Sequence, residues 1–326
     1  MGTPSLFRVT ADGGGALERD GHFSLRVPAL FSRRDDAQRF VSAQRFFVGP
    51  SATWSPTPST TLTLLAVYQD DRYDRTTPLP VAGTLQPSSA GPVPRDTFLG
   101  EPRLTRLLSP QWQIGYLFEH RFGDVLRFCS KLRLVRYGVR GPILSVNQDG
   151  STDDSVVRSG FDCDVDTHSL SLDNQLEGAV TTGPLQHTVL LGVDHLRYRS
   201  TSVGASFDLA PISPVQFIYG AKPGPRTPLF SSQAELDETG LYARYRGKLW
   251  GWLIGLVGVR SAHVDNVSVD RLRDARTDQP DAKTTFDAAA MALGPLGGRP
   301  DLPSPPRRSS IWEWPTHSIA CASGST

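Results

Sequence analysis

Residues 112–122, WQIGYLFEHRF, alternate between two kinds of side chain with a period of two. One set of alternate residues is apolar apart from a single histidine, and it comprises Trp112, Ile114, Tyr116, Phe118, His120 and Phe122. The other set is mostly polar or charged and includes Gln113, Glu119 and Arg121. Successive side chains of a strand point to opposite faces, so the segment predicts a β-strand with one apolar and one polar face. Its length suits a tilted strand that crosses a bilayer, which needs roughly 9–11 residues.

Other segments of the chain carry the same alternation. They lie at 61–70, 125–137, 167–180 and 187–198, with further candidate strands at 45–54, 238–249 and 252–263. Together with residues 112–122, these segments predict about eight strands.

The connections between these segments alternate between short and long. Short turns lie at 55–60, 123–124, 181–186 and 250–251, and long connections span 71–111, 138–166 and 199–237. In an outer-membrane barrel, short turns face the periplasm and long loops face outward, whereas long structureless loops are uncommon in compact soluble domains. The sequence therefore predicts an all-β antiparallel meander that forms part of a transmembrane β-barrel, with its apolar face toward lipid.

Two other folds are compatible with the alternation. A complete, passive porin or adhesin barrel of about eight strands would show the same pattern. So would a soluble β-sandwich binding module, in which the apolar face would pack on a second sheet.

Composition excludes several classes of function. The net charge of +1 gives no field that would favour nucleic acid as a partner. No run of 18 apolar residues exists, which excludes a spanning helix. The scattered cysteines Cys129, Cys163 and Cys321 fit neither a disulfide framework nor a metal site. Residues 1–20 lack a charged segment followed by an apolar one, so we expect no signal peptide in this chain.

Several of these segments resemble TonB-dependent siderophore receptors of the ferrichrome/hydroxamate branch. Residues 45–85 resemble the first barrel hairpin of that family, and so do residues 115–128. Residues 187–199 resemble a family strand with a Gly-x-Asp motif, here Gly192-Val193-Asp194. Residues 238–260 resemble its Gly-x-Tyr hairpin. The similarity runs in order over roughly residues 38–290.

The resemblance implies a transporter in the bacterial outer membrane. Family barrels have about 22 strands and a lumen closed by an N-terminal plug. A ferric hydroxamate-type siderophore would bind at the outer loops, and the TonB energy-coupling complex would act on the plug. Because the ligand undergoes no covalent chemistry, the resemblance implies no enzymatic activity, no catalytic residue, no cofactor and no resident metal.

The sequence also departs from the family pattern. Residues 1–39 match poorly, residues 40–270 match the barrel, and residues 271–326 are of low complexity and are expected to be disordered or frameshifted. The plug and the region that contacts TonB have no counterpart here. We therefore expect an incomplete barrel, a fragment of a receptor that does not itself transport.

Aromatic residues of the outer loops are the expected ligand contacts, because hydroxamate siderophores are large and partly apolar. By resemblance, Phe207 follows the Gly-x-Asp strand, and Tyr73, Phe217 and Tyr219 lie on other outer loops. The alternative is that each of these rings packs the loops themselves. In the ferrichrome branch, aromatics precede a Leu-Pro-x-x-Gly-Thr stretch. Here that stretch spans 79–84 and follows Thr-Thr-Pro, so ferrichrome itself is disfavoured.

Overall fold

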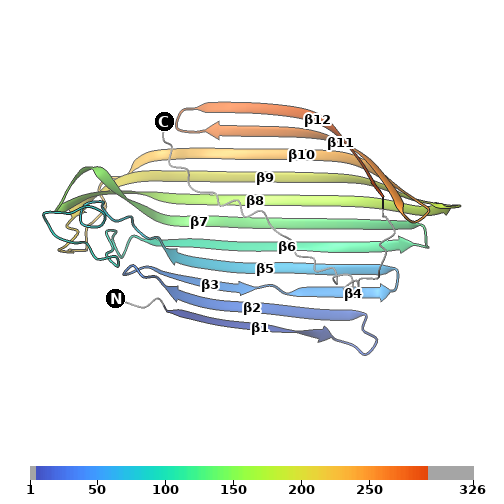
Figure 1. Ribbon diagram of the computed structural model, residues 1–326, viewed down its shortest axis with the longest axis horizontal. Coiled ribbons are helices and arrows are strands. Elements are labelled where there is room, and N and C mark those ends of the chain that lie inside the picture. The colour runs from blue at the N-terminus through green and yellow to red at the C-terminus, as the bar shows by residue number, and fades with distance from the viewer. Residues whose placement is uncertain (1–4, 293–326) are drawn as a thin grey trace.

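The computed structural model describes residues 5–292, and the regular secondary structure in that range is entirely β-strand. The strands are β1 (Leu6–Ala16), β2 (Phe23–Asp35), β3 (Ser42–Val48), β4 (Ser51–Thr57), β5 (Thr60–Asp74), β6 (Arg106–Phe122), β7 (Leu126–Thr152), β8 (Ser155–Thr182), β9 (Leu185–Ile212), β10 (Thr227–Leu249), β11 (Leu253–Asp270) and β12 (Ala275–Ala292). They form one antiparallel sheet in chain order, with β3 and β4 sharing a single position between β2 and β5 (Figure 1). Within residues 5–292, no helix is long and apolar enough to cross a membrane.

The sheet is an open meander. Within the described range, β1 and β12 each pair with one neighbour only, so the strands form a wall and not a closed cylinder. This confirms the predicted all-β antiparallel meander. The number of strands is larger than predicted, with twelve in place of about eight.

The apolar residues of successive strands share one face of the sheet. Residues paired across antiparallel strands lie on the same face, and the register places Leu64 opposite Tyr116, Tyr116 opposite Leu132, and Leu132 opposite Leu172. This outer face is open, with 55% of the surface of Ile114 exposed. No second sheet covers it within residues 5–292, so the β-sandwich alternative is wrong.

Aromatic and charged side chains mark the two ends of this apolar band. Toward the end of the sheet that carries the long connections, Trp112 lies opposite Arg136, and Arg136 binds Asp166 at 2.8 Å on the same face. At the other end, Trp250 and Trp252 stack with ring centroids 6.4 Å apart. Aromatic girdles of this kind flank the lipid-facing band of a membrane barrel.

One rim of the sheet carries only brief turns, as predicted. These turns lie at the right of Figure 1 and span 17–22, 58–59, 123–125, 183–184 and 250–252. The opposite rim carries the long connections 75–105 and 213–226, but it also carries the brief turns 36–41, 153–154 and 271–274. The prediction that long loops span 138–166 and 199–237 is therefore wrong. Most of those residues continue β7, β8, β9 and β10 beyond the apolar band, where the strand pairing persists although the outer face is no longer apolar.

Both ends of the described chain also differ from expectation. Within the poorly matched residues 1–39, Leu6–Ala16 and Phe23–Asp35 form the β1–β2 hairpin, in which Val9 lies opposite Phe31 on the outer face. The expectation of a disordered tail from residue 271 is wrong for Ala275–Ala292, which pair with β11 along their whole length. Residues 293–326, the rest of the predicted tail, lie outside the described residues.

Buried side chains gather at the rim with the long connections. One cluster contains Leu107, Val139 and Val165 from β6, β7 and β8. A second packs Leu99 of the 75–105 connection against Val156 of β8 and nearby residues. The core thus fixes the outer loops on the extended strands, while the middle of the sheet is one layer thick.

Candidate ligand-binding site

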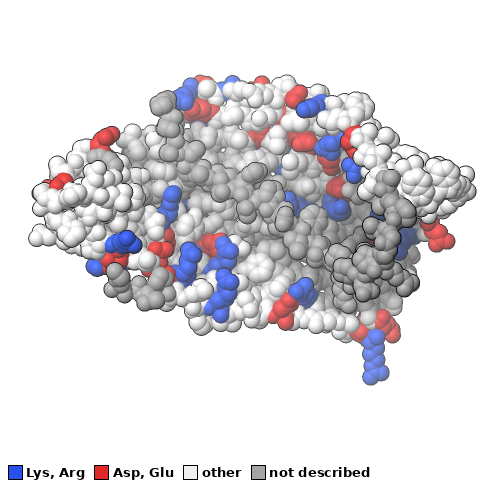
Figure 2. Space-filling view, viewed as in Figure 1, with Lys and Arg blue, Asp and Glu red and all other residues white. Residues whose placement is uncertain are grey.

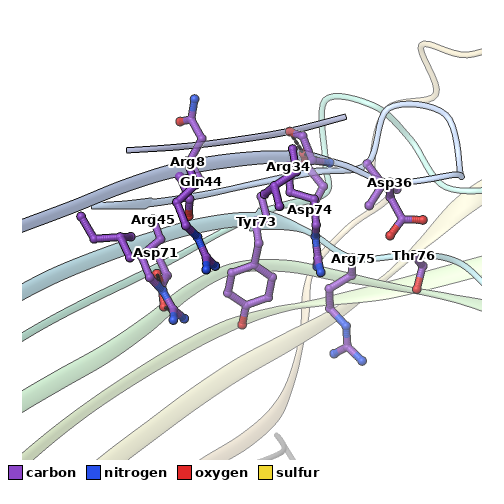
Figure 3. A pocket seen from close by; sticks show the side chains of 16 residues that line it. Arg8, Arg34, Asp36, Gln44, Arg45, Asp71, Tyr73, Asp74, Arg75 and Thr76 are labelled. Atoms are coloured by element: carbon purple, nitrogen blue, oxygen red, sulfur yellow. Dashed lines mark hydrogen bonds and ion pairs between the residues drawn. The ribbon is translucent and has the colours of Figure 1, made fainter. Parts of the chain in front are cut away.

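A cleft of about 640 Å³ lies on the inner face of β1, β2, β3 and β5, next to the rim with the long connections. Alternate residues of neighbouring strands line it because they point to the same face: Arg8 of β1, Arg34 of β2, Arg45 of β3, and Asp71 and Tyr73 of β5. In Figure 3 the side chains of Arg45, Asp71 and Tyr73 extend to one side of the strands. A cleft of this size suits a small-molecule ligand.

Two ion pairs organise the wall of the cleft. Arg45 reaches across from β3 and binds both carboxylate oxygens of Asp71, at 2.7 and 2.8 Å. Asp74, at the end of β5, binds Arg106 of β6 at 2.9 and 3.0 Å. Asp74 also accepts hydrogen bonds from the hydroxyl and backbone N–H of Ser42 and from the hydroxyl of Thr105.

The hydrogen bonds to Asp74 determine its protonation. Burial by itself would raise the pKa of this carboxyl, but the hydrogen bonds from Arg106, Ser42 and Thr105 and the charge of Arg106 together lower the pKa below its ordinary value. Asp74 is therefore ionised at neutral pH and is already neutralised by Arg106.

Three arginines of the cleft have no such partner. Within residues 5–292, Arg8, Arg34 and Arg75 make no hydrogen bond or ion pair with another side chain. The remaining acidic group, Asp36, accepts a hydrogen bond from the backbone N–H of Gln38 at 3.2 Å. Several basic side chains gather at the lower left of the face seen in Figure 2, over the region that β1–β5 occupy in Figure 1. The cleft therefore carries excess positive charge.

A buried polar network holds the 75–105 connection beside the cleft. The side-chain amide of Gln38 donates to the carbonyl oxygens of Thr77 and Thr97 at 2.9 and 2.8 Å, and its oxygen accepts the N–H of Thr77 at 2.8 Å. Thr77 also accepts the N–H of Leu99 through its hydroxyl. All donors and acceptors of the Gln38 side chain are thereby engaged with backbone groups, so this connection has a defined conformation next to the cleft.

A buried ion pair links the same connection to the rest of the rim. Arg158 of β8 and Glu101 lie 4.0 Å apart, with side chains 2% and 3% exposed. Arg158 also donates to the carbonyl oxygens of Ala210 and Gly100, while Glu101 accepts the N–H of Gly220 and of Ala221. This ion pair and its hydrogen bonds thus help to hold the connections 75–105 and 213–226 together.

The aromatic residues predicted to contact a ligand occupy different environments. Tyr73 lines the cleft. Phe217 and Tyr219 pack against the cluster around Leu99, and the hydroxyl of Tyr219 donates to the carbonyl of Phe98 at 2.9 Å. Phe207 is 3% exposed, with the Arg226 guanidinium 5.4 Å from its ring centroid. Of the four, Tyr73 is the one that the structure places in the cleft lining, and ligand contact by all four rings stays a prediction.

The Gly-x-Asp motif of β9 and the Gly-x-Tyr motif of β10 contact each other on the inner face of the sheet. A side chain at Gly192 would collide with Tyr242, since its Cβ would lie 2.1 Å from the ring. The Tyr242 hydroxyl passes over this glycine and donates to Asp173 of β8 at 2.6 Å. Gly240 leaves similar room for Arg260, which binds Asp194, the last residue of the Gly-x-Asp motif. The motif residues are therefore engaged in side-chain contacts that join β8 to β11 on the lumen wall.

Arg8 and Arg34 were missed by sequence analysis because residues 1–39 were set aside as poorly matched, and Arg75 was missed because only aromatic residues were sought in the long connections. A signal was nevertheless present in β2, where Phe23, Leu25 and Val27 alternate with Ser24 and Arg26. Reading that alternation as a strand would have placed Arg34 on the lumen face.

Within residues 5–292, no group of three or more His, Cys, Asp or Glu side chains could hold a metal ion. The site chemistry of the cleft is therefore that of arginine, aspartate and tyrosine, which suits reversible binding.

Comparison with known proteins identifies relatives over most of the chain. The family model described as TonB dependent receptor-like, beta-barrel matches residues 50–293. The ferrioxamine B receptor of Salmonella typhimurium (strain SL1344) is 27% identical over 290 residues, covering 88% of this chain and 41% of that protein. The ferrichrome outer membrane transporter/phage receptor of Escherichia coli K12 is 27% identical over 330 residues, covering 92% of this chain and 43% of that protein. The chain thus spans less than half the length of these curated relatives.

Solved structures show the same fold. The ferric-catecholate import receptor Fiu from E. coli K12, in its open form, superposes with a TM-score of 0.73 at 18% identity, covering 89% of this chain and 51% of that chain. The ferripyoverdine receptor of Pseudomonas aeruginosa superposes with a TM-score of 0.72 at 19% identity, covering 89% of this chain and 39% of that chain.

Proposed function

Because this chain belongs to the TonB-dependent receptor family, we propose that it forms part of the wall of an outer-membrane receptor that binds a ferric siderophore of the hydroxamate type. The family places the protein in the outer membrane, and the apolar outer face of the sheet meets the physical requirement of that location. The observation that carries the proposal is the polar cleft beside Tyr73, on the lumen face next to the long connections.

The choice of ligand class is supported by the relatives. Two of them are named as receptors for ferrioxamine B and for ferrichrome. A ferric siderophore is a bulky complex with polar and apolar edges, so a cleft of about 640 Å³ that combines a tyrosine with charged groups suits part of its surface. The proposed activity is binding and release, without a catalytic residue or a resident cofactor, and energised uptake through the TonB complex is proposed for the receptor as a whole.

The open sheet leads to a proposal about transport. Within residues 5–292, β1 and β12 do not pair with each other, so the described strands do not enclose a lumen. A lipid bilayer offers no partners to the free N–H and C=O groups of such edges. We therefore propose that the described sheet binds its ligand but does not transport it without further strands.

Equilibrium binding tests the proposed function. The chain in detergent micelles is dialysed against radiolabelled ferric complexes, namely a neutral tris-hydroxamate and a hydroxamate that bears carboxylates. We expect saturable binding of at least one complex and, for Tyr73→Ala, a dissociation constant raised about tenfold, the scale of a lost aromatic contact of roughly 1.4 kcal/mol. The control is Phe122→Ala, because Phe122 is an exposed ring on the outer face at the opposite rim. Absence of saturable binding of every ferric complex would overturn the proposal.

A further inference from the structure

The excess positive charge of the cleft indicates which class of ferric siderophore it binds. Resting on the function proposed above, we infer that the cleft selects ferric siderophore complexes that carry free carboxylate groups, and that Arg8, Arg34 and Arg75 bind those carboxylates. These arginines are specificity-determining residues of the same site.

The other charged groups of the cleft are already neutralised. Arg45 is paired with Asp71 through two hydrogen bonds. Asp74 is paired with Arg106 from outside the cleft lining. The unpaired groups of the lining are then Asp36 with one negative charge and Arg8, Arg34 and Arg75 with three positive charges. The cleft therefore presents a net positive charge to any ligand within it.

The positions of these arginines favour a ligand with several anionic groups. On the inner face, Arg8 lies opposite Ser32 and Arg34 lies opposite Leu6, so the two arginines occupy diagonal positions on adjacent strands. Diagonal positions are about 7–8 Å apart at the backbone, within reach of one anionic group for long side chains. Arg75 follows β5 directly and lines the same cleft, and in Figure 3 its side chain extends to the same side as that of Tyr73.

The chemistry of arginine selects carboxylate over an uncharged complex. A guanidinium presents planar N–H donors that match a carboxylate through two parallel hydrogen bonds. Three hydroxamate anions neutralise Fe³⁺, so a simple tris-hydroxamate complex has no charge for these groups to bind. A hydroxamate siderophore with free carboxylates keeps a negative charge after it has bound iron. Only the second kind of complex would engage all three unpaired arginines.

Comparing the affinities of the chain for two ferric complexes tests this inference. The full chain in detergent micelles is dialysed against a radiolabelled ferric hydroxamate–citrate complex and against a neutral ferric tris-hydroxamate. The test variant carries Arg8→Gln, Arg34→Gln and Arg75→Gln. The matched control carries Arg33→Gln, Arg72→Gln and Arg140→Gln, which remove the same charge from the opposite face of the sheet near the same rim. Circular dichroism checks that both variants keep their strands.

We expect the wild-type chain to bind the carboxylate-bearing complex at least about tenfold more tightly than the neutral one, as several charge-assisted contacts would produce. The test variant should lose that tenfold preference and the control should keep it. Raising the salt from about 0.05 M to about 0.5 M should weaken binding of the carboxylate-bearing complex by wild type and control much more than by the test variant, because salt screens exposed charges. If the test variant loses its strands, the salt dependence of binding by the wild type decides whether the cleft selects the carboxylate-bearing complex over the neutral one.

Two results would overturn the inference in distinguishable ways. Equal binding of both complexes by the wild type, with no dependence on salt, would remove the role of the three arginines while the proposed receptor function stands. Binding of neither complex would remove the proposed function and this inference together.

Discussion

Replacing Leu176 with arginine tests whether the apolar face of the sheet lies in lipid. Leu176 is 40% exposed and lies opposite Phe128 of β7 and Leu191 of β9, in the middle of the apolar band. An arginine on the lipid face near the bilayer midplane costs about 2–4 kcal/mol. Since 1.36 kcal/mol is a tenfold change, the folding equilibrium in a bilayer should fall roughly 30- to 900-fold.

The neighbouring residue provides a matched control. Gln175 lies on the inner face, where its side chain donates to Asp173 at 2.7 Å, so Gln175→Arg places the same charge beside a carboxylate. Urea unfolding in phosphatidylcholine vesicles, followed by tryptophan fluorescence, measures both variants. If the free energies of unfolding of Leu176→Arg and Gln175→Arg both lie within about 0.5 kcal/mol of wild type, the usual range for an exposed site in water, the lipid-face interpretation is wrong.

Three further predictions concern the lumen wall and the outer rim. Gly192→Ala should destabilise the sheet by about 1–3 kcal/mol because its Cβ would collide with Tyr242, and the double variant with Tyr242→Ala should recover most of that loss in urea unfolding. The hydrogen bonds to Asp74 lower its pKa in the folded state, so its ionised form stabilises the fold. This contribution to the free energy of unfolding is fully present above the unfolded pKa near 3.8 and is lost as the pH falls through the lower folded pKa. Asp74→Asn should abolish this loss of stability at acid pH in an unfolding titration. Arg158→Met should leave Glu101 buried without its charge partner at a cost of about 3–5 kcal/mol, seen as faster amide exchange in 75–105 and 213–226, whereas unchanged exchange there would refute the role of the pair.

The middle of the sheet is predictable from sequence because membrane and lumen impose different side chains on its two faces. The register confirms this for residues 112–122, whose apolar set lies opposite Leu64 on one side and Leu132 on the other. The constraint ends where the strands leave the bilayer. Beyond Trp112 the outer face carries Arg136 and Asp166. The apolar residues of β8 change there to the inner face, where Cys163 and Val165 are buried, so the pattern of a lipid-facing strand ends although the strand continues.

The edges of the sheet and the candidate site were harder to predict for a related reason. The outward-facing residues of β1 include the small residues Gly13 and Gly15, and β12 carries a run of alanines near its end. Neither strand therefore shows a continuous set of large apolar residues on one face. The cleft depends on β1 and β2, and its arginines become neighbours only through the pairing of these strands with β3 and β5. Of the predicted contact residues, Tyr73 alone could be placed there, because whether an outer-loop aromatic packs or is free depends on tertiary contacts.

Site-directed spin labelling along β9 tests the central claim most directly. Single cysteines are introduced in turn over 187–198 in a cysteine-free background, labelled with a nitroxide, and studied in lipid vesicles. If the outer face meets lipid, collision with oxygen should peak at Val189, Leu191 and Val193, while a water-soluble nickel reagent should favour Thr188 and Leu190. Equal access of the nickel reagent to both sets would contradict the account.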